Sequence, residues 1–267
     1  MTPNVTLTIA GSDSGGGAGI QADLRAFGAH AVFGTSVVTA VTAQNTTGVS
    51  DVHVVPKENV EAQLIAVLED LPVAAVKTGM LATAELVELV ASYAASGRLP
   101  NLVVDPVLVS ATGHRLLEDE AIRTYREQLL PAATVATPNV HEAAALVGRQ
   151  LDDLDDITAA AHELADLGTA VVVVKGGHLA GETAVDVVVA HGDVHHLTAQ
   201  RVDTDNVHGT GCTFASACAA GLANGLEPLG ALDHAKSYVT RCIVGAQEWE
   251  LGSGPGPIDH LGFSGAT

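Results

Sequence analysis

The feature that most constrains this chain is an alternation of short apolar runs with longer amphipathic stretches along its whole length. The runs at 102–104 and 171–174 consist of aliphatic, mostly β-branched residues with no polar alternation. Such runs are typical of strands that are covered on both faces of a sheet. Strands that alternate with helices form βαβ units, so the sequence predicts a three-layer α/β fold with a mostly parallel sheet.

The same pattern gives the expected elements. Strands are predicted at 5–10, 36–43, 52–55, 74–77, 102–104, 134–137, 171–175, 184–191 and 194–201. Helices are predicted at 20–28, 57–69, 84–95, 118–129, 140–147, 157–167, 213–224 and 230–248. The turn at 191–193 predicts one antiparallel hairpin. No linker-like stretch or internal repeat divides the 267 residues, so we expect one domain spanning 1–267.

Charge and cysteine usage exclude several classes of protein. The formal net charge is −19, which argues against binding to duplex nucleic acid or to an anionic membrane. It leaves room for a small anionic ligand, because helix N-termini and a few lysines bind phosphate locally. Three cysteines without a signal peptide predict a reducing cytoplasm, and no apolar run approaches the ~20 residues of a membrane span.

Polar and glycine residues follow most of the predicted strands. In open α/β sheets, ligands bind outside the carboxyl ends of the strands, so these positions predict where a ligand site lies. Any one of them would be an ordinary turn, but together they predict a site. They are Gly11-Ser12-Asp13, Gln44-Asn45, Thr78-Gly79-Met80, Asp105-Pro106, Pro138-Asn139 and Gly176-Gly177-His178.

A first glycine cluster spans residues 11–19 and links the first strand to a helix. It lacks the Lys-Ser/Thr pair of a phosphate-binding P-loop, and it does not fit the Gly-x-Gly-x-x-Gly pattern. So many glycines are costly to order, which favours a backbone that closes tightly on a small ligand. Asp23 and Gln44 could face that ligand, although either could also be a solvated helix residue or a strand cap.

A second cluster, Asn-Val-His-Gly-Thr-Gly-Cys-Thr at 206–213, opens a helix with small residues. Unpaired N–H groups at such a helix start can converge on an anion and stabilise a transferred phosphoryl group. Cys212 lies in the first turn, where the helix field is expected to lower the pKa of its thiol. Cys218 and Cys242 fall within apolar helical patterns and are expected to be buried and inert.

Two acids and a lysine suggest a metal and phosphate site. Asp105 and Glu142 are placed for Mg²⁺ ligation through waters, although Glu142 could simply favour a helix N-terminus. Lys175 follows a buried strand and is either a solvated cap or a point charge for phosphate. Zinc is not expected, because no Cys-x-x-Cys spacing occurs and His191, His195 and His196 lack a matching partner pair.

These motifs resemble those of the hydroxymethylpyrimidine/phosphomethylpyrimidine kinases of thiamine biosynthesis, within the ribokinase-like superfamily. The resemblance covers TIAGSDSGGGAGIQAD, VTAVTAQNT, VKTGML, VVDPV, ATPNVHEA, VVVKGGH and HGTGCTFASA, in the family's order. It implies a ribokinase-like fold, usually a homodimer, that phosphorylates a pyrimidine alcohol with ATP and Mg²⁺. It further implies a second phosphorylation, of the monophosphate, in the same site.

The resemblance also assigns residue roles. It implies that Cys212 is the catalytic base, with the 209–212 backbone as an anion hole and Lys175 on the ATP phosphates. The implied pyrimidine pocket comprises Gly11, Asp23, Gln44, Met80 and Val107. The implied nucleotide and metal residues are Asn139, Lys175, Gly209, Thr210, Gly211 and Lys236 for ATP, and Asp105 and Glu142 for Mg²⁺. Ala111 and His114 depart from the family pattern, in a loop expected to close over phosphates.

Two other functions remain open from the sequence. Pyridoxine/pyridoxal kinases have very similar sequences, and Met80 and Gln44 favour the pyrimidine without deciding the preference. A nucleotide-binding regulator without turnover is the alternative from a different class. Intact Cys212, Lys175 and the complete 206–213 loop argue for catalysis.

Overall fold

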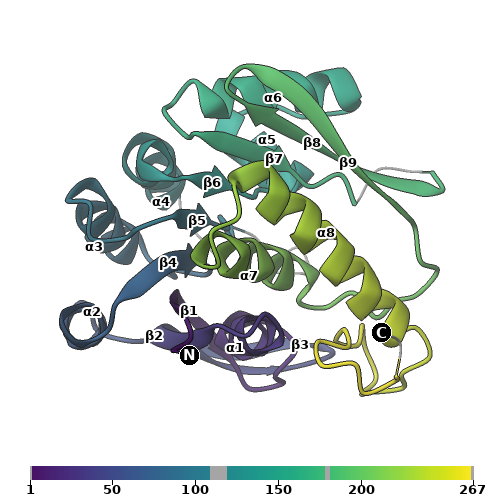
Figure 1. Ribbon diagram of the computed structural model, residues 1–267, viewed down its shortest axis with the longest axis horizontal. Coiled ribbons are helices and arrows are strands. Elements are labelled where there is room, and N and C mark those ends of the chain that lie inside the picture. Colours follow the sequence, from purple (N-terminus) through teal and green to yellow (C-terminus); the bar gives the residue numbers. More distant parts are fainter. Residues whose placement is uncertain (1, 109–118, 178–180, 266–267) are drawn as a thin grey trace.

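A nine-stranded sheet forms the centre of the protein in a computed structural model, which describes residues 2–108, 119–177 and 181–265 (Figure 1). Its strand order is β3-β2-β1-β4-β5-β6-β7-β8-β9. The strands are β1 (Val5–Asp13), β2 (Phe33–Asn45), β3 (Gly48–Val54), β4 (Val73–Thr78), β5 (Leu102–Val104), β6 (Val135–Ala136), β7 (Val171–Val174), β8 (Thr183–Ala190) and β9 (Asp193–Gln200).

The helices flank this sheet. They are α1 (Gly19–Ala29), α2 (Lys57–Asp70), α3 (Ala84–Ala95), α4 (Asp119–Thr124), α5 (Val140–Val147), α6 (Leu154–Ala165), α7 (Thr210–Ala223) and α8 (Pro228–Gly245). The predicted elements are confirmed to within a few residues, except for the helix at 118–129. There α4 ends at Thr124, and a π-turn (Tyr125–Leu129) and a 3₁₀ turn (Leu130–Ala132) follow. Pro131 has no N–H to continue a regular helix.

The sheet is mostly parallel, as predicted, but it holds more antiparallel pairs than the one hairpin expected. Besides β8–β9, β2 pairs antiparallel with β3 and β7 with β8. The β2–β3 turn is closed by Asn45, whose Oδ1 accepts hydrogen bonds from Thr47 N (2.8 Å) and Oγ1 (2.7 Å). Between β7 and β8 only residues 175–182 connect the strands, which is too short for a parallel crossover.

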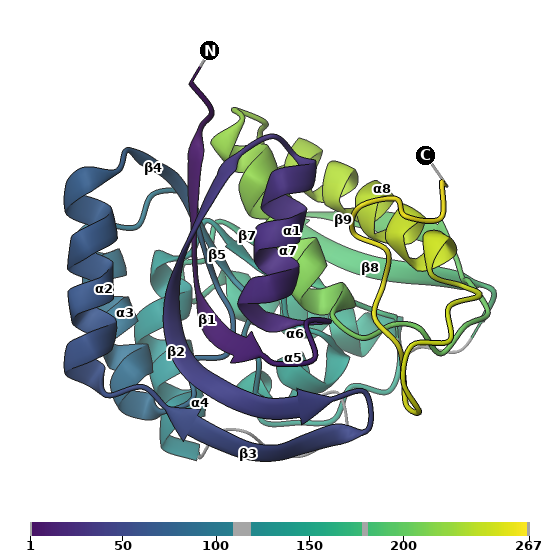
Figure 2. The same ribbon diagram turned by 90° about the horizontal axis from the view of Figure 1, so that it is seen from below.

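Two apolar cores lie on opposite faces of the sheet. Along β5, Leu102 and Val104 join the core beneath α2, α3, α5 and α6, whereas Val103 joins the core beneath α1, α7 and α8. Figure 2 shows α2 and α3 on one side of the sheet and α1, α7 and α8 on the other. This alternation is the period of two that strands impose on their side chains. The three-layer prediction is thus confirmed, whereas the single domain spanning 1–267 stays a prediction. No described helix is long and apolar enough to cross a membrane.

A charged cluster is enclosed between β1, β4, α1 and α7. Lys77 Nζ lies 2.8 and 2.9 Å from the two carboxylate oxygens of Asp23, and both side chains are fully buried. Thr8 and Ser216 each donate a hydrogen bond of 2.6 Å to the same carboxylate. Burial opposes the charge on Lys77, but Asp23 outweighs it, and the pKa of Lys77 is raised. The ammonium is therefore retained inside the protein.

We predict that Lys77→Met lowers the free energy of unfolding by about 3–5 kcal/mol, because it leaves the Asp23 carboxylate buried without its cation. Chemical denaturation monitored by circular dichroism would measure the loss. Lys57→Met is the matched control, since Lys57 pairs with Glu85 at 3.5 Å in a solvent-exposed position and is expected to change stability by less than about 1 kcal/mol. Equal losses in the two variants would contradict the prediction.

Candidate functional site

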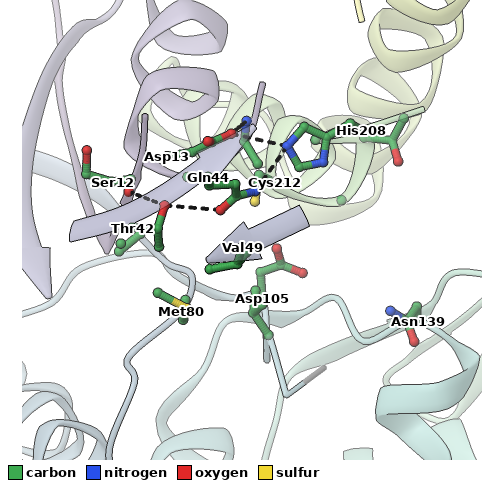
Figure 3. A pocket seen from close by; sticks show the side chains of 18 of the residues that line it. Ser12, Asp13, Thr42, Gln44, Val49, Met80, Asp105, Asn139, His208 and Cys212 are labelled. Atoms are coloured by element: carbon green, nitrogen blue, oxygen red, sulfur yellow. Dashed lines mark hydrogen bonds and ion pairs between the residues drawn. The ribbon is translucent and has the colours of Figure 1, made fainter. Parts of the chain in front are cut away.

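The carboxyl ends of the parallel strands border a cavity of about 490 Å³, which the start of α7 closes on one side (Figure 3). The cavity lies at the edge of the sheet where the polar strand ends predict a ligand site. The predicted residues that line it are Gly11, Gln44, Met80, Asp105, Val107, Asn139, Glu142, Lys175, Gly209, Thr210, Gly211 and Cys212. Ala111, His114 and His178 lie outside the described residues.

The first glycine loop is organised around Asp13 at the end of β1. Its carboxylate accepts backbone hydrogen bonds from Gly15 (2.8 Å), Gly17 (3.0 Å) and Ala18 (2.9 Å). Burial alone would raise the pKa of Asp13, but the contact with His208 and these N–H donors outweigh it and lower the pKa. Asp13 is therefore an anion that holds the loop in shape.

The second glycine loop is pressed against the first. Gly209, at φ +87°, is the N-cap of α7, and a Cβ there would lie 1.9 Å from the carbonyl oxygen of Gly17. Only glycine satisfies both the backbone conformation and the close approach. Thr210, Gly211 and Cys212 in the first turn of α7 line the cavity, and Thr210 N donates to Val207 O at 3.2 Å. The first N–H groups of a helix have no partner within the helix and can receive an anion.

A cluster of charges lies opposite this helix start. Lys175 Nζ is 2.9 Å from Asp105 Oδ1, and Thr137 donates to the same oxygen at 3.1 Å. Burial opposes the charge on Lys175, but the Asp105 and Glu142 carboxylates outweigh it and raise its pKa. An ammonium is thus held at the edge of the cavity, where it can contact a phosphate group.

Asn139 and Glu142 form a capping box at the start of α5. Asn139 N donates to Glu142 Oε2 (2.8 Å), and Glu142 N donates to Asn139 Oδ1 (2.9 Å). Burial, with Asp105 adding to it and Lys175 opposing it, raises the pKa of Glu142 to about 8. The two hydrogen bonds show that Glu142 caps the helix, which was one of its two expected roles. Glu142 also lines the cavity.

The donor set fits Mg²⁺. Among the described residues no group of three or more His, Cys, Asp or Glu side chains could hold a metal ion. Mg²⁺ needs no such cage, since it keeps several waters and uses one or two carboxylates together with substrate phosphates. Asp105 and Glu142 offer hard oxygen ligands of that kind, and a cation would favour the ionised form of Glu142 against its raised pKa.

The predicted lowering of the Cys212 pKa is wrong. Burial raises the pKa of this thiol to about 11, although the Lys77 ammonium and the Gly19 N–H act in the opposite direction. The thiol faces the cavity but is protonated at neutral pH. Cys218 and Cys242 are buried and unpaired, as expected.

Two predicted site residues do not reach the cavity. Asp23 is fully buried behind it, and its carboxylate is bound by Lys77, because its position on α1 faces β1 and α7. Lys236 pairs with Asp186 at 2.7 Å, and Asp186 accepts a hydrogen bond from Gly176 N at 3.0 Å. Neither side chain lines the cavity, so direct ligand contacts by Asp23 and Lys236 are not supported.

Sequence reasoning missed several lining residues. Asp13 and His208 line the cavity. They lie in the first and second glycine clusters, but neither of them was assigned a role from the sequence. Val49 and Val52 reach the cavity from β3, which was not predicted to fold back onto β2. The signal for His208 was its place immediately before the Gly-Thr-Gly-Cys turn.

Comparisons with known proteins agree with this geometry. A family model described as phosphomethylpyrimidine kinase matches residues 13–259. The hydroxymethylpyrimidine/phosphomethylpyrimidine kinase of Streptomyces coelicolor is 50% identical over 260 residues, which are 97% of this chain and 95% of that protein.

Solved structures agree as well. The Bacillus subtilis pyridoxal kinase in complex with ADP has a TM-score of 0.89 and 38% identity, over 97% of this chain and 98% of that one. The phosphomethylpyrimidine kinase of Clostridium difficile has a TM-score of 0.80 and 41% identity, over 90% of this chain and 99% of that one. The loops, the cavity and these matches lead to one conclusion: the chain belongs to the phosphomethylpyrimidine kinase family.

Proposed function

We propose that this protein transfers the γ-phosphoryl group of ATP to 4-amino-5-hydroxymethyl-2-methylpyrimidine, and then to the resulting monophosphate. The observation that carries the proposal is one cavity that apolar side chains line on one side and the start of α7 lines on another. Gln44, Met80 and Val107 lie on the ring side, and the 209–212 backbone lies on the phosphate side. Family membership supplies the reaction type.

The ring side offers flat apolar walls and one amide. A Cβ at Gly11 would lie 2.6 Å from Met80 Cε, so glycine there leaves room for the Met80 side chain. We assign Met80 and Val107 to the two walls of the ring pocket and Gln44 to its polar edge. Gly11 contributes backbone and space rather than a side chain.

The phosphate side would bind ATP through local charge. Lys175 would contact the phosphates, Asn139 would contact the nucleotide, and the backbone of Gly209, Thr210, Gly211 and Cys212 would receive the transferred group. Asp105 and Glu142 would hold Mg²⁺, which neutralises part of the phosphate charge when bound. The hydroxyl oxygen forms the new P–O bond, the bond to ADP breaks, and the hydroxyl proton goes to the Cys212 sulfur in its thiolate form.

Pyridoxal phosphorylation is the second candidate, because the pyridoxal kinase of Bacillus subtilis shares the fold over nearly the full chain. The same cavity would accept either ring, so only turnover distinguishes them. The binding-only alternative has no support from the site, in which Cys212, Lys175 and the 209–212 loop all line one cavity. The homodimer and the cytoplasmic location remain predictions, the latter from three unpaired cysteines.

A coupled ADP-release assay tests the proposal with the pyrimidine alcohol, its monophosphate and pyridoxal as separate substrates. We expect turnover of both pyrimidines, with kcat/KM for the alcohol above that for pyridoxal. Higher kcat/KM for pyridoxal would favour the second candidate. MgATP binding without ADP release from any of the three would favour the regulator.

We predict that Cys212→Ala retains the fold and lowers kcat in a pH-dependent way. The thiolate is the active form, and with a pKa of about 11 its fraction rises about tenfold per pH unit between pH 7 and 9. The ratio of wild-type to Cys212→Ala kcat should therefore be small at pH 7 and widen toward pH 9, into the ~10²–10⁴-fold range of general-base catalysis. A ratio that stays constant from pH 7 to 9 would remove the base role.

We predict that Lys175→Met weakens MgATP binding at every salt concentration, because it removes a close, partly desolvated charge. A hydrogen bond to a charged group contributes about 1.5–3 kcal/mol, which corresponds to roughly 10- to 150-fold in affinity. For the wild type, added salt should improve MgATP affinity or leave it unchanged, because it screens the distant repulsion from a net charge of −19. Calorimetric titrations at several salt concentrations would decide, and a steep loss of wild-type affinity with salt would contradict this phosphate site.

A further inference from the structure

A chain of polar side chains crosses the ring side of the cavity from Ser12 to Asp13 (Figure 3). Thr42 Oγ1 lies 3.0 Å from Ser12 O and 3.1 Å from Gln44 Oε1. At the other end of the Gln44 amide, Nε2 lies 3.4 Å from His208 Nε2, which is 3.1 Å from Asp13 Oδ2. The two ends of this chain determine which groups donate and which accept.

At the Asp13 end, the histidine must be the donor. Asp13 has a lowered pKa and accepts three backbone N–H groups, so it is a carboxylate and can only accept. His208 Nε2 therefore carries a hydrogen, whether the ring is neutral or charged. A nitrogen that carries a hydrogen cannot also accept one from the Gln44 NH₂ group, so an amide with Nε2 toward His208 sets two donors against each other.

At the Thr42 end, the hydroxyl has a single hydrogen. Ser12 O is a carbonyl oxygen and can only accept, so the Thr42 hydrogen is committed there. An amide with Oε1 toward Thr42 then sets two oxygens facing each other without a hydrogen between them. Both ends of the amide thus require the same reversal, and each requires it independently.

We propose that the Gln44 amide lies with Nε2 toward Thr42 and Oε1 toward His208, and that His208 is the positioning residue that fixes this order. An amide oxygen and nitrogen are told apart by their partners, and in the reversed order no donor faces a donor and no acceptor faces an acceptor. Ser12 O accepts from Thr42, and Thr42 accepts from Gln44 Nε2. Gln44 Oε1, at 3.4 Å, and Asp13 Oδ2, at 3.1 Å, then share the single hydrogen on His208 Nε2. His208 thereby acts on the ligand through Gln44.

The fixed order has a consequence for the substrate, and this step rests on the proposed function. With one N–H and one lone pair engaged, the amide keeps one N–H on the Thr42 side and one lone pair on the His208 side. An aminopyrimidine offers the complement, a ring nitrogen that accepts beside an amino group that donates. The ring nitrogen would lie toward Thr42 and the amino group toward His208, which sets the direction of the ring in the pocket. A ring without that adjacent pair leaves the amide half satisfied.

The ring nitrogens of His208 provide the first test, by nuclear magnetic resonance on ¹⁵N-histidine-labelled full-length protein without substrate. The signal is assigned by its loss in His208→Gln, which separates it from those of the other histidines. We expect hydrogen on Nε2, seen as the Nε2–H tautomer or as the doubly protonated ring. An unprotonated Nε2 would overturn the proposal. This readout does not depend on turnover, so it stands even if the protein fails to phosphorylate the pyrimidine.

The second test is a double-mutant cycle in the ADP-release assay. His208→Leu should raise KM for the pyrimidine alcohol by roughly tenfold, as expected for a polar group left unpaired in a desolvated pocket, with little change in KM for ATP. His208→Gln, whose amide nitrogen can replace the Nε2 donor, should recover most of the loss. Adding His208→Leu to Gln44→Leu should cause no further rise, because His208 acts through Gln44.

The controls make each outcome decisive. His195→Leu, on exposed β9, should leave both KM values unchanged, and thermal melting identifies any variant that does not fold. Equal rises of KM for ATP and the pyrimidine would overturn the proposal, and so would full additivity with Gln44→Leu. Either result would mean that His208 only stabilises the contact between the two glycine loops. If the wild type phosphorylates pyridoxal but no pyrimidine, the proposed function fails. The NMR result then decides by itself whether His208 Nε2 carries the hydrogen that the proposal requires.

Discussion

The whole site depends on the close approach of two backbones, at Gly17 in the first glycine loop and Gly209 in the second. A Cβ at Gly209 would lie 1.9 Å from the Gly17 carbonyl oxygen, so any side chain there would push α7 away from the end of β1. The start of α7 carries the phosphate-side N–H groups and Cys212, whereas the end of β1 carries Asp13 on the ring side. On the proposed function, the contact therefore fixes the separation of the two reacting ligands, and such positioning supplies a large part of the rate in phosphoryl transfer.

The lysines inside the protein are paired with acids. Three of the four lysines are taken up by single acids: Lys77 by Asp23, Lys175 by Asp105 and Lys236 by Asp186. Such pairs add little net stability, but they hold elements from distant parts of the chain in register. Of the three lysines, Lys175 lines the cavity, and it already shares its charge with Asp105. A nucleotide must therefore compete with Asp105, which explains why a divalent cation between acid and phosphate would assist binding.

The sequence predicts the sheet and most of the cavity because both follow from local patterns. Aliphatic runs mark buried strands, and the polar residues after them meet at one edge. The direction in which a side chain points, and its contacts with residues far away in the chain, do not follow from local patterns. Asp23 follows the glycine loop, yet its position on α1 turns it toward Lys77 rather than the ligand. The weak Asn-Thr-Thr-Gly turn hid the β2–β3 hairpin and its valines. The role of His208 depends on Asp13, which lies 195 positions away.

The raised pKa of Cys212 changes how the chemistry is divided among the groups of the site. With a pKa of about 11, about one thiol in ten thousand is ionised at pH 7. That deficit is as large as the upper range of a general base's contribution, ~10⁴-fold, so the two roughly cancel at neutral pH. Phosphoryl transfer passes through a loose transition state, in which little proton removal is needed before the new bond forms. In the proposed reaction, the N–H groups of α7 and the Lys175 ammonium would act on charge that is present throughout the transfer. On that proposal they carry most of the acceleration at neutral pH, and the thiol contributes increasingly as the medium becomes alkaline.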